Sequence, residues 1–323
     1  MASPVTSASA GRSRDPTEGF RHEAFLYSGL DEFLHGMLPF IREGVERQEP
    51  VLVVIGADKI ELLRAELGLN GGSDEVLFAD MEAVGRNPAR IIPAWRDFVG
   101  ARPDPGRPVR GIGEPIYPER SQDELAECHR HESLVNLAFA DTPGFWLMCP
   151  YDVDALDAAV IEGARRNHPL IRRDGSASKS EGYEQAPVVF QEPLPEPVGE
   201  PHELAFDAGT IAALRAFLQR FALDAGMSPT KAGDFLLASN EAASNSIRHG
   251  GGAGLLRVWE DGDTLISEVR DSGVIDTPLA GRERPTPGKP GGRGLWLANQ
   301  LCELVQLRSF PNGNVVRLHM RRS

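Results

Sequence analysis

The sequence predicts two domains of different fold class, an α/β domain with a parallel sheet followed by an α+β sandwich. Three observations support this prediction. Strand-like and helix-like stretches alternate over residues 21–172, prolines and small polar residues mark a linker over 173–200, and amphipathic helices accompany paired strands over 201–323. Residues 1–20, which are rich in serine, alanine, glycine and arginine, are expected to form a disordered tail.

In the first domain, short apolar runs alternate with segments of helical periodicity. Val51–Gly56 is a β-branched run that ends in glycine, which is typical of a strand buried on both faces. Because strands connected through helices pair in parallel, the alternation predicts a parallel sheet with helices on both faces. The expected strands are 23–27, 51–56, 76–79, 109–113 and 145–150, and the expected helices are 30–47, 59–67 with Asp58 as its cap, 88–100, 121–139 and 154–166.

In the second domain, helices precede and separate pairs of strands. Ser228-Pro229 is an N-cap followed by proline at the first helical position, so a helix is expected to begin there. Pro311–Asn314 is typical of a hairpin turn. The expected helices are 207–225, one from 228 and one from 294, and the expected strands are 255–259, 265–271, 304–309 and 315–320.

The composition excludes several classes of protein. The chain has 323 residues, of which 41% are apolar and 25% charged, as in globular proteins. A net charge of −13 argues against a general binder of nucleic acid or anionic membranes, and no apolar run approaches the roughly 20 residues that span a bilayer. Cys128, Cys149 and Cys302 form no CxxC pair, and the N-terminus lacks the apolar core of a signal peptide. We therefore expect reduced thiols and a cytoplasmic protein.

Two motifs in the last third of the chain carry the strongest functional information. Glu241, Asn245 and His249 are four residues apart in an expected helix, so their side chains share one face. A carboxylate, an amide and an imidazole in this arrangement suit metal binding, activation of a nucleophile or orientation of phosphates. Further along, Gly291–Leu295 opens another helix, where exposed backbone N–H groups can bind phosphate oxygens. Together the motifs predict a magnesium-nucleotide site.

The order of three motifs points to a family. Glu241-x-x-x-Asn245 lies on a helix, Asp271-Ser-Gly273 follows a strand, and Gly291-Gly-Arg-Gly294 opens a helix. In this order they resemble the GHKL ATPase superfamily, in particular its branch of anti-sigma factor serine kinases, over about residues 200–323. The resemblance implies ATP and Mg²⁺ as cofactors, with Asn245 holding the metal and Glu241 acting as general base towards a protein hydroxyl.

The resemblance also assigns the remaining nucleotide contacts. Asp271 would bind the adenine amino group, and Gly273 would let the ring approach the backbone. The cofactor-binding segment of the last motif comprises Gly292, Arg293, Gly294 and Leu295, in which the two glycines offer N–H groups to the phosphates and Arg293 either faces them or lies on the surface. The loop from Asp276 to Gly291, with Arg282, Arg284 and Lys289, corresponds to the mobile lid of the family.

One departure from the family pattern bears on activity. The family's first glycine motif usually reads Asp-x-Gly-x-Gly, whereas Ile275 stands here in place of the second glycine. A β-branched residue there stiffens the loop and narrows the expected pocket. A non-catalytic module that binds partners according to its nucleotide is therefore kept as an alternative to a kinase. Histidine autokinase, with His131-Glu132 as acceptor motif, is a third and weaker alternative because the motif lacks the usual proline and lies in the other domain.

The first domain resembles the MEDS sensory domain over about residues 20–170. The matching segments are His22–Tyr27, Glu43-Gly44, Glu49–Val54, Gly113-Glu114, Cys149–Asp152 and His168-Pro169. The resemblance implies a RecA-like fold that senses small, often hydrocarbon-derived, molecules. No Gly-Lys-Ser/Thr loop follows its first strands, so this domain is not expected to be an ATPase.

Ligands of open α/β sheets bind at the carboxyl ends of the strands. The candidates nearest those ends are Glu114, Cys149, Tyr151 and His168, although burial in the core is the preferred explanation for each of them taken singly.

The two resemblances together imply a cytosolic regulator. A sensor of small molecules would report to an anti-sigma-type ATPase domain, which binds a sigma factor or its antagonist and, if catalytic, phosphorylates the antagonist on serine or threonine. No direct contact with nucleic acid or membrane is expected, and a homodimer is compatible with the family.

Overall fold

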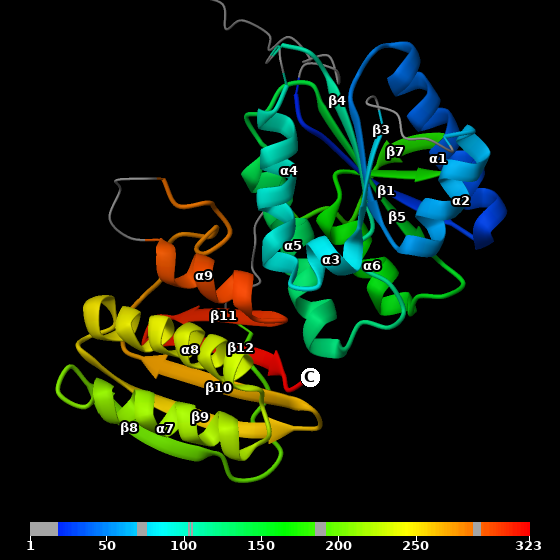
Figure 1. Cartoon of the computed structure of the whole chain (residues 1–323). Helices are drawn as coiled ribbons and strands as arrows, with labels where there is room; N and C mark the ends of the chain where they lie inside the picture. The colour runs from blue at the N-terminus through cyan, green and yellow to red at the C-terminus, as the bar shows by residue number, and fades with distance from the viewer. Residues whose placement is uncertain (1–18, 70–75, 103, 105, 185–191, 287–291) are drawn as a thin grey trace, which may run out of the picture.

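The computed structural model describes residues 19–69, 76–102, 104, 106–184, 192–286 and 292–323, and these form two sheets, each covered by helices (Figure 1). The expected disordered tail lies almost entirely outside the described residues. Within the described part of the chain, no helix combines the length and the apolar character that a membrane crossing requires.

The first sheet has seven strands in the order β3-β2-β4-β5-β1-β6-β7. All pairs among the first six strands are parallel, and only β7 is antiparallel, against β6. The strands are β1 Arg21–Tyr27, β2 Val51–Ile55, β3 Val76–Asp80, β4 Val109–Gly113, β5 Phe145–Asp152, β6 Leu170–Arg173 and β7 Ser176–Lys179. The expected parallel sheet is thus confirmed, with one antiparallel strand at its edge.

Helices cover both faces of this sheet, as predicted. One apolar cluster joins α1 and α2 to the sheet through residues such as Phe33 and Leu63, and the other joins α4, α5 and α6 through residues such as Trp95 and Leu134. The helical segments are α1 Gly29–Glu46, α2 Ala57–Leu67, α3 Met81–Gly85, the 3-10 turn η1 Pro88–Arg90, α4 Ile91–Gly100, α5 Gln122–Ala138 and α6 Ala158–Asn167.

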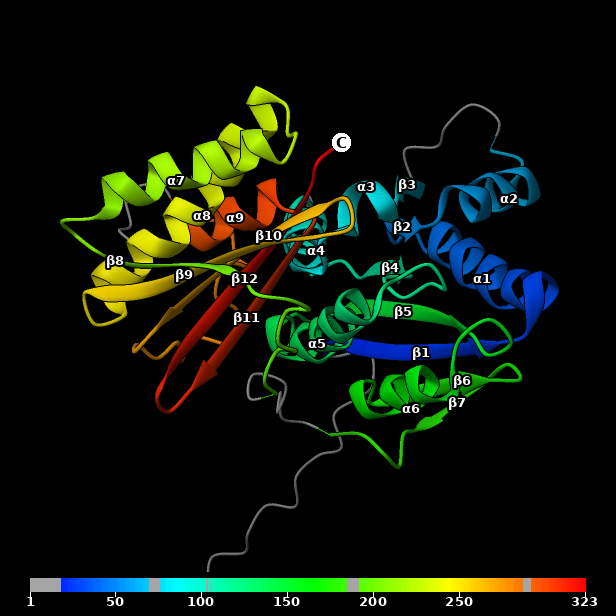
Figure 2. The ribbon, with the colours of Figure 1, turned by 90° about the horizontal axis from the view of Figure 1, so that it is seen from below.

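The second sheet has five antiparallel strands in the order β11-β12-β10-β9-β8. Figure 2 shows that all three helices of this half cover the same face of the sheet. The elements are β8 His202–Asp207, α7 Ile211–Asp224, α8 Pro229–His249, β9 Ala253–Asp261, β10 Thr264–Asp271, α9 Arg293–Leu301, β11 Leu304–Phe310 and β12 Gly313–Arg321. This arrangement confirms the predicted α+β sandwich.

The structure differs from the expected elements at several places, and helix α3 is one that was not expected. Gly56, not Asp58, is the N-cap of α2, because the helix begins one residue before the aspartate and includes it in the first turn. The stretch expected to be a linker begins with the hairpin β6–β7, which turns at Asp174 and Gly175 with positive φ angles of 50° and 75°. Strand β8 was likewise missed, because most residues of these edge strands are exposed and show no apolar alternation.

The other face of the second sheet packs against the first domain, which lies beside α9 and β11 in Figure 1. Arg130 of α5 donates to the carbonyl of Leu307 in β11 at 2.8 Å, and Arg308 donates to Glu127 of α5 at 2.6 Å. The amide of Asn87 donates to the main-chain carbonyl of Asn299, at the end of α9, at 3.2 Å. Helix α5 is therefore shared between the core of the first domain and the domain interface.

Candidate functional site

The helix that carries the first motif has one apolar and one polar side. Ser228 caps α8 by accepting a hydrogen bond from the N–H of Lys231, and alanines together with Phe235 bury one side of the helix in the core. Glu241 and Asn245 lie on the other side, where both are half-buried. The predicted shared face of these two residues is therefore present at the core boundary, where a ligand can reach it.

The last motif lies directly against this polar face. A Cβ atom at Gly294 would lie 2.8 Å from Glu241 Oε2 and 2.9 Å from Asn245 Nδ2. Helix α9 begins one residue earlier, and its N-cap Gly292 has a left-handed φ of 77°, which glycine adopts without strain. The structure thus brings together the carboxylate, the amide and the N-terminus of α9, where free N–H groups and the helix dipole favour anions.

Asp271 is held rigidly at the end of β10. Its Oδ2 accepts a hydrogen bond from Ser246 of α8 at 2.6 Å, and its Oδ1 accepts from the N–H of Gly273 at 2.8 Å and from the amide of Asn314 at 3.0 Å. Since Ser246 directly follows Asn245, these bonds position the second motif relative to the first. A Cβ atom at Gly273 would lie 2.8 Å from Gly250 Cα, so only glycine allows this close approach of two main chains.

Ile275 has a structural role that its position in the motif did not suggest. Its side chain packs against the apolar core of the second domain. Its N–H donates to Ser309 Oγ at 2.9 Å and to Asn314 Oδ1 at 3.1 Å. The main-chain N–H at this position therefore holds the loop to the sheet hairpin, and the isoleucine side chain adds an apolar contact. The expected stiffening stays a prediction.

The sequence did not single out Arg248, which lies over the polar face of α8. Its guanidinium donates to Asn245 Oδ1 at 3.3 Å and approaches Glu241 Oε2 at 3.9 Å. The spacing of three and seven residues could have revealed it, because both separations return to the same helix face. Its side chain is more than half exposed, so it adds positive charge at the rim of the site.

The other predicted residues of the site have different surroundings. His249 and Arg293 are exposed, whereas the side chain of Leu295 packs against the apolar core. Leu295 therefore supports α9 from within and has only its main chain to offer a ligand. Lys289 and Gly291 lie outside the described residues.

The segment expected to form a mobile lid is attached to the first domain over residues 276–286. Arg282 is only 2% exposed and donates to Glu127 of α5 at 3.3 Å, and Leu279 packs against the apolar core of the first domain. Arg284 pairs with Asp97 of α4 at 2.6 Å, and Glu283 pairs with Arg96. Arg282 and Arg284 of the expected lid therefore bind carboxylates of the first domain.

The four ligand candidates of the first domain separate into two groups. Glu114, which follows β4, accepts hydrogen bonds from Lys59 at 2.5 Å and from Tyr27 at 3.3 Å. Burial raises the pKa of Glu114, although the Lys59 ammonium opposes this effect. Cys149 lies within β5 rather than at its carboxyl end, because the strand continues to Asp152.

Cys149, His168 and Tyr151 lie together on the face of the first sheet that α5 and α6 cover, near Glu132 of α5. His131, the acceptor considered for a histidine autokinase, is only 2% exposed, and burial lowers its pKa to about 3.

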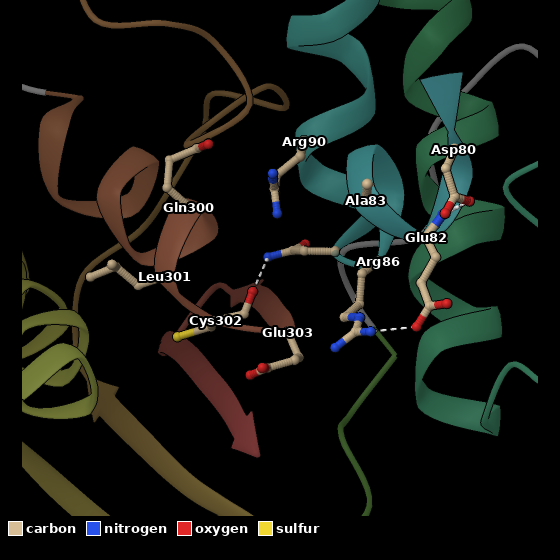
Figure 3. A pocket seen from close by; sticks show the side chains of 10 residues that line it. Asp80, Glu82, Ala83, Arg86, Arg90, Gln300, Leu301, Cys302 and Glu303 are labelled. Carbon is tan, nitrogen blue, oxygen red and sulfur yellow. Dashed lines mark hydrogen bonds and ion pairs between the residues drawn. The ribbon is translucent and has the colours of Figure 1, made fainter. Parts of the chain in front are cut away.

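A cavity of about 440 Å³ lies between the two domains, next to α3 and the end of α9 (Figure 3). Arg90 extends into it from the first domain, and Gln300 extends from the second. Its wall is strongly polar and shares no residue with the predicted nucleotide site. The lining residues are Asp80, Glu82, Ala83, Arg86, Asn87, Arg90, Gln300, Leu301, Cys302 and Glu303.

Comparison with known families agrees with both resemblances. Residues 21–169 match the family described as "MEDS: MEthanogen/methylotroph, DcmR Sensory domain", and residues 204–320 match the family described as "Histidine kinase-like ATPase domain". A search of curated proteins gave no match.

Similar solved structures include the RsbU and RsbW domains of Rv1364c from Mycobacterium tuberculosis, at 16% identity over 38% of this chain and 32% of that chain, with a TM-score of 0.29. They also include the histidine kinase AdeS of Acinetobacter baumannii, at 12% identity over 38% of this chain and 68% of that chain, with a TM-score of 0.22. The match therefore spans about a third of the first of these two chains.

Proposed function

We propose that this chain, which consists of a MEDS sensory domain followed by a histidine kinase-like ATPase domain, is a signalling protein in which the first domain controls an ATP-dependent activity of the second. The observation that carries the proposal is the attachment of residues 276–286 to the sensor. This segment lies between the second and third ATPase motifs, and its buried Arg282 is bound by Glu127 of α5. A change in the sensor that moves α5 would therefore reach the edge of the nucleotide site directly.

The residues of the site suit a magnesium nucleotide. Gly294 lets the N-terminus of α9 lie directly against Glu241 and Asn245, where a Cβ atom would clash, and this N-terminus favours phosphate oxygens. The amide oxygen of Asn245 is a hard ligand of the kind that Mg²⁺ prefers, and Arg248 at the rim complements negative charge. Asp271, whose carboxylate is oriented by Ser246 and Asn314, would accept a hydrogen bond from an adenine amino group.

A serine/threonine kinase activity is part of the proposal. Bound ATP would supply the phosphoryl group that is transferred. Glu241 would accept the proton of the substrate hydroxyl, and the N–H groups at the start of α9 would stabilise phosphate charge. The substrate would be an antagonist protein that competes for a sigma factor, and this choice rests on the likeness of the motifs to anti-sigma factor kinases. The cytoplasm is the compartment in which such partners meet.

The second candidate is a non-catalytic module that binds its partner according to the bound nucleotide. Two observations favour it. Ile275 departs from the family motif and fastens the adenine-side loop to the hairpin, and Arg248 donates to the amide oxygen that is the expected metal ligand. Histidine autokinase activity has less support, because His131 is almost completely buried.

Labelled ATP distinguishes the candidates. We expect Asn245→Ala to abolish magnesium-dependent ATP binding, and Glu241→Gln to keep binding while lowering phosphoryl transfer to an antagonist by about 10²–10⁴-fold, the usual contribution of a general base. Asn240→Ala is the matched control, since this neighbouring asparagine bonds Arg215 on α7. Tight ATP binding without phosphoryl transfer to any antagonist from the native cell would rule out the kinase and support the binding module. Failure to bind ATP at all would refute both.

The coupling between the domains has its own test. Glu127→Gln removes the carboxylate charge that faces the buried guanidinium of Arg282, so we expect the segment to detach. Breaking a buried ion pair costs about 3–5 kcal/mol. The population of the detached state, and with it the rate of cleavage, should therefore rise by on the order of a hundredfold or more. Trypsin should then cut after Arg282, whereas the bond after Arg284 is protected by Pro285 in every variant. Asp97→Asn, at an exposed pair with Arg284, should change little. Equal protection of Arg282 in Glu127→Gln would contradict the coupling.

A further inference from the structure

Four side chains that can bind metals meet inside the first domain. His22 lies on β1, Cys149 on β5, Glu132 on α5, and His168 directly follows α6. All four are at most 2% exposed, and one ligand atom of each lies within 4.8 Å of all the others. The group therefore lies between the sheet and the two helices, away from the nucleotide site and from the cavity between the domains.

Four of the six separations between these atoms match those of ligands around one tetrahedral metal ion, and the other two are at most 4.8 Å. The Nε2 atoms of His22 and His168 lie 3.1 and 3.3 Å from Glu132 Oε2. Cys149 Sγ lies 3.4 Å from His22 Nε2 and 3.6 Å from Glu132 Oε2. Bond lengths typical of zinc place tetrahedral N and O ligands about 3.3 Å apart, and S and N or O ligands about 3.6 Å apart. Each of the four distances agrees with these values within about 0.2 Å, the tolerance of an assigned metal site.

The outer hydrogen bonds orient both imidazoles for metal binding. His168 Nδ1 lies 2.8 Å from the carbonyl of Ala164, which can only accept, so Nδ1 carries the proton. Asn136 donates its amide N–H to the carbonyls of Glu132 and Asn167, so its oxygen faces His22 Nδ1 at 3.0 Å and also accepts. Both Nε2 lone pairs therefore point at the carboxylate and the thiol, as in histidines that bind metals.

A cation is needed at the point where these atoms converge. Two imidazole lone pairs, a carboxylate and a sulfur face one another, and Glu132 Oε1 has no hydrogen-bond partner among the described residues. A buried carboxylate without compensating charge is strongly unfavourable.

We propose that His22, Glu132, Cys149 and His168 form a binding site for a borderline divalent metal ion, of which Zn²⁺ fits the tetrahedral N₂SO donor set best. Cys149 binds as the thiolate, and its proton is released to solvent when the metal enters. The ion joins two strands to two helices, and Glu132 lies five residues from Glu127 on the same helix. The metal therefore fixes the helix that holds residues 276–286, independently of whether the second domain is catalytic.

The full-length chain, purified without chelators, tests the site directly. We expect one zinc ion per chain by elemental analysis, and we expect replacement by Co²⁺ to give the thiolate-to-cobalt charge-transfer band of a tetrahedral site. Cys149→Ser should remove that band, whereas Cys128→Ser should keep it, because the buried thiol of Cys128 instead donates to the carbonyl of Pro115. Asn136→Ala should weaken metal affinity by about 10–100-fold without removing a ligand.

Two outcomes would overturn the proposal. One is wild-type protein that contains no metal after growth with added zinc and shows no thiolate band with Co²⁺. This result does not depend on how any variant folds. The other is unchanged metal content and an unchanged cobalt spectrum in folded Cys149→Ser, which would place the ion elsewhere.

Discussion

Gly294→Val is expected to weaken binding of magnesium-ATP by on the order of 10–100-fold, since forced overpacking typically costs about 1–3 kcal/mol. The physical reason is the close approach of α9 to α8. A Cβ atom at this position would lie 2.8 Å from the Glu241 carboxylate and 2.9 Å from the Asn245 amide, so a branched side chain displaces the groups that bind the metal and the phosphates. Calorimetric titration with the nucleotide measures the loss.

Gly233→Val is the matched control for this change. Gly233 also lies within a helix, α8, but a Cβ atom there meets nothing within 4 Å. The control separates a change of helix propensity from a change at the site. Equal affinities in the two variants would show that the contact between Gly294 and α8 does not shape a nucleotide site.

Glu268→Ala is expected to lower the free energy of unfolding of the second domain by about 3–5 kcal/mol, the usual effect of breaking a buried ion pair. Glu268 lies on β10, is fully buried, and accepts hydrogen bonds from Arg257 at 2.9 Å, Arg270 at 2.7 Å and Arg317 at 2.6 Å. Removing the carboxylate leaves Arg257 and Arg317 buried with one counter-charge fewer. Denaturation by urea, followed by circular dichroism, measures the change.

The matched control for Glu268 is Glu196→Ala. Glu196 also bonds Arg257 and Arg270, at 2.8 Å each, but its side chain is 64% exposed, so its removal should cost only about 0–1 kcal/mol. A loss for Glu268→Ala no larger than this control would contradict the prediction.

The same carboxylate predicts how stability depends on pH. Burial by itself raises the pKa of Glu268, but the charge and hydrogen bonds of Arg317, together with Arg270, outweigh burial and hold the pKa below its ordinary value of 4.5. The folded state therefore binds this proton less readily than the unfolded chain. The contribution of Glu268 to stability should be complete above pH 4.5 and should fall as the pH drops towards the lower, folded pKa. Glu268→Gln should remove this part of the acid sensitivity.

The sequence predicted the helices that carry the proposed nucleotide motifs because each motif is local. The four-residue spacing of Glu241 and Asn245 defines a helix face, and Gly292 is needed where the chain enters α9 with a positive φ angle. The alternation of apolar runs was sufficient for both fold classes. Strands β7 and β8 were missed because edge strands bury little, and apolar periodicity is the signal by which strands are recognised.

The surroundings of Arg282 could not be predicted, because they depend on a contact over 155 residues of sequence. A cationic loop between two ATPase motifs suggests a lid that faces phosphates, and the sequence contains nothing that selects Glu127 as its partner. The same holds for the metal cluster, in which His22 and Cys149 are 127 residues apart. In the sequence, Cys149 and His168 lie apart from the other two residues, and each by itself is a plausible core residue.

By itself, the sequence determined the two fold classes, the family likeness of each half and the helix face that carries Glu241 and Asn245. These properties follow from short-range periodicity and from the backbone freedom of glycine. Both can be recognised from the order of residues alone. Only the tertiary structure decided that the expected lid is bound to the sensor and that His22, Glu132, Cys149 and His168 share one buried site. Such convergence depends on how strands and helices pack over long sequence separations, and burial then turns separate polar residues into a cluster that needs a charge at its centre.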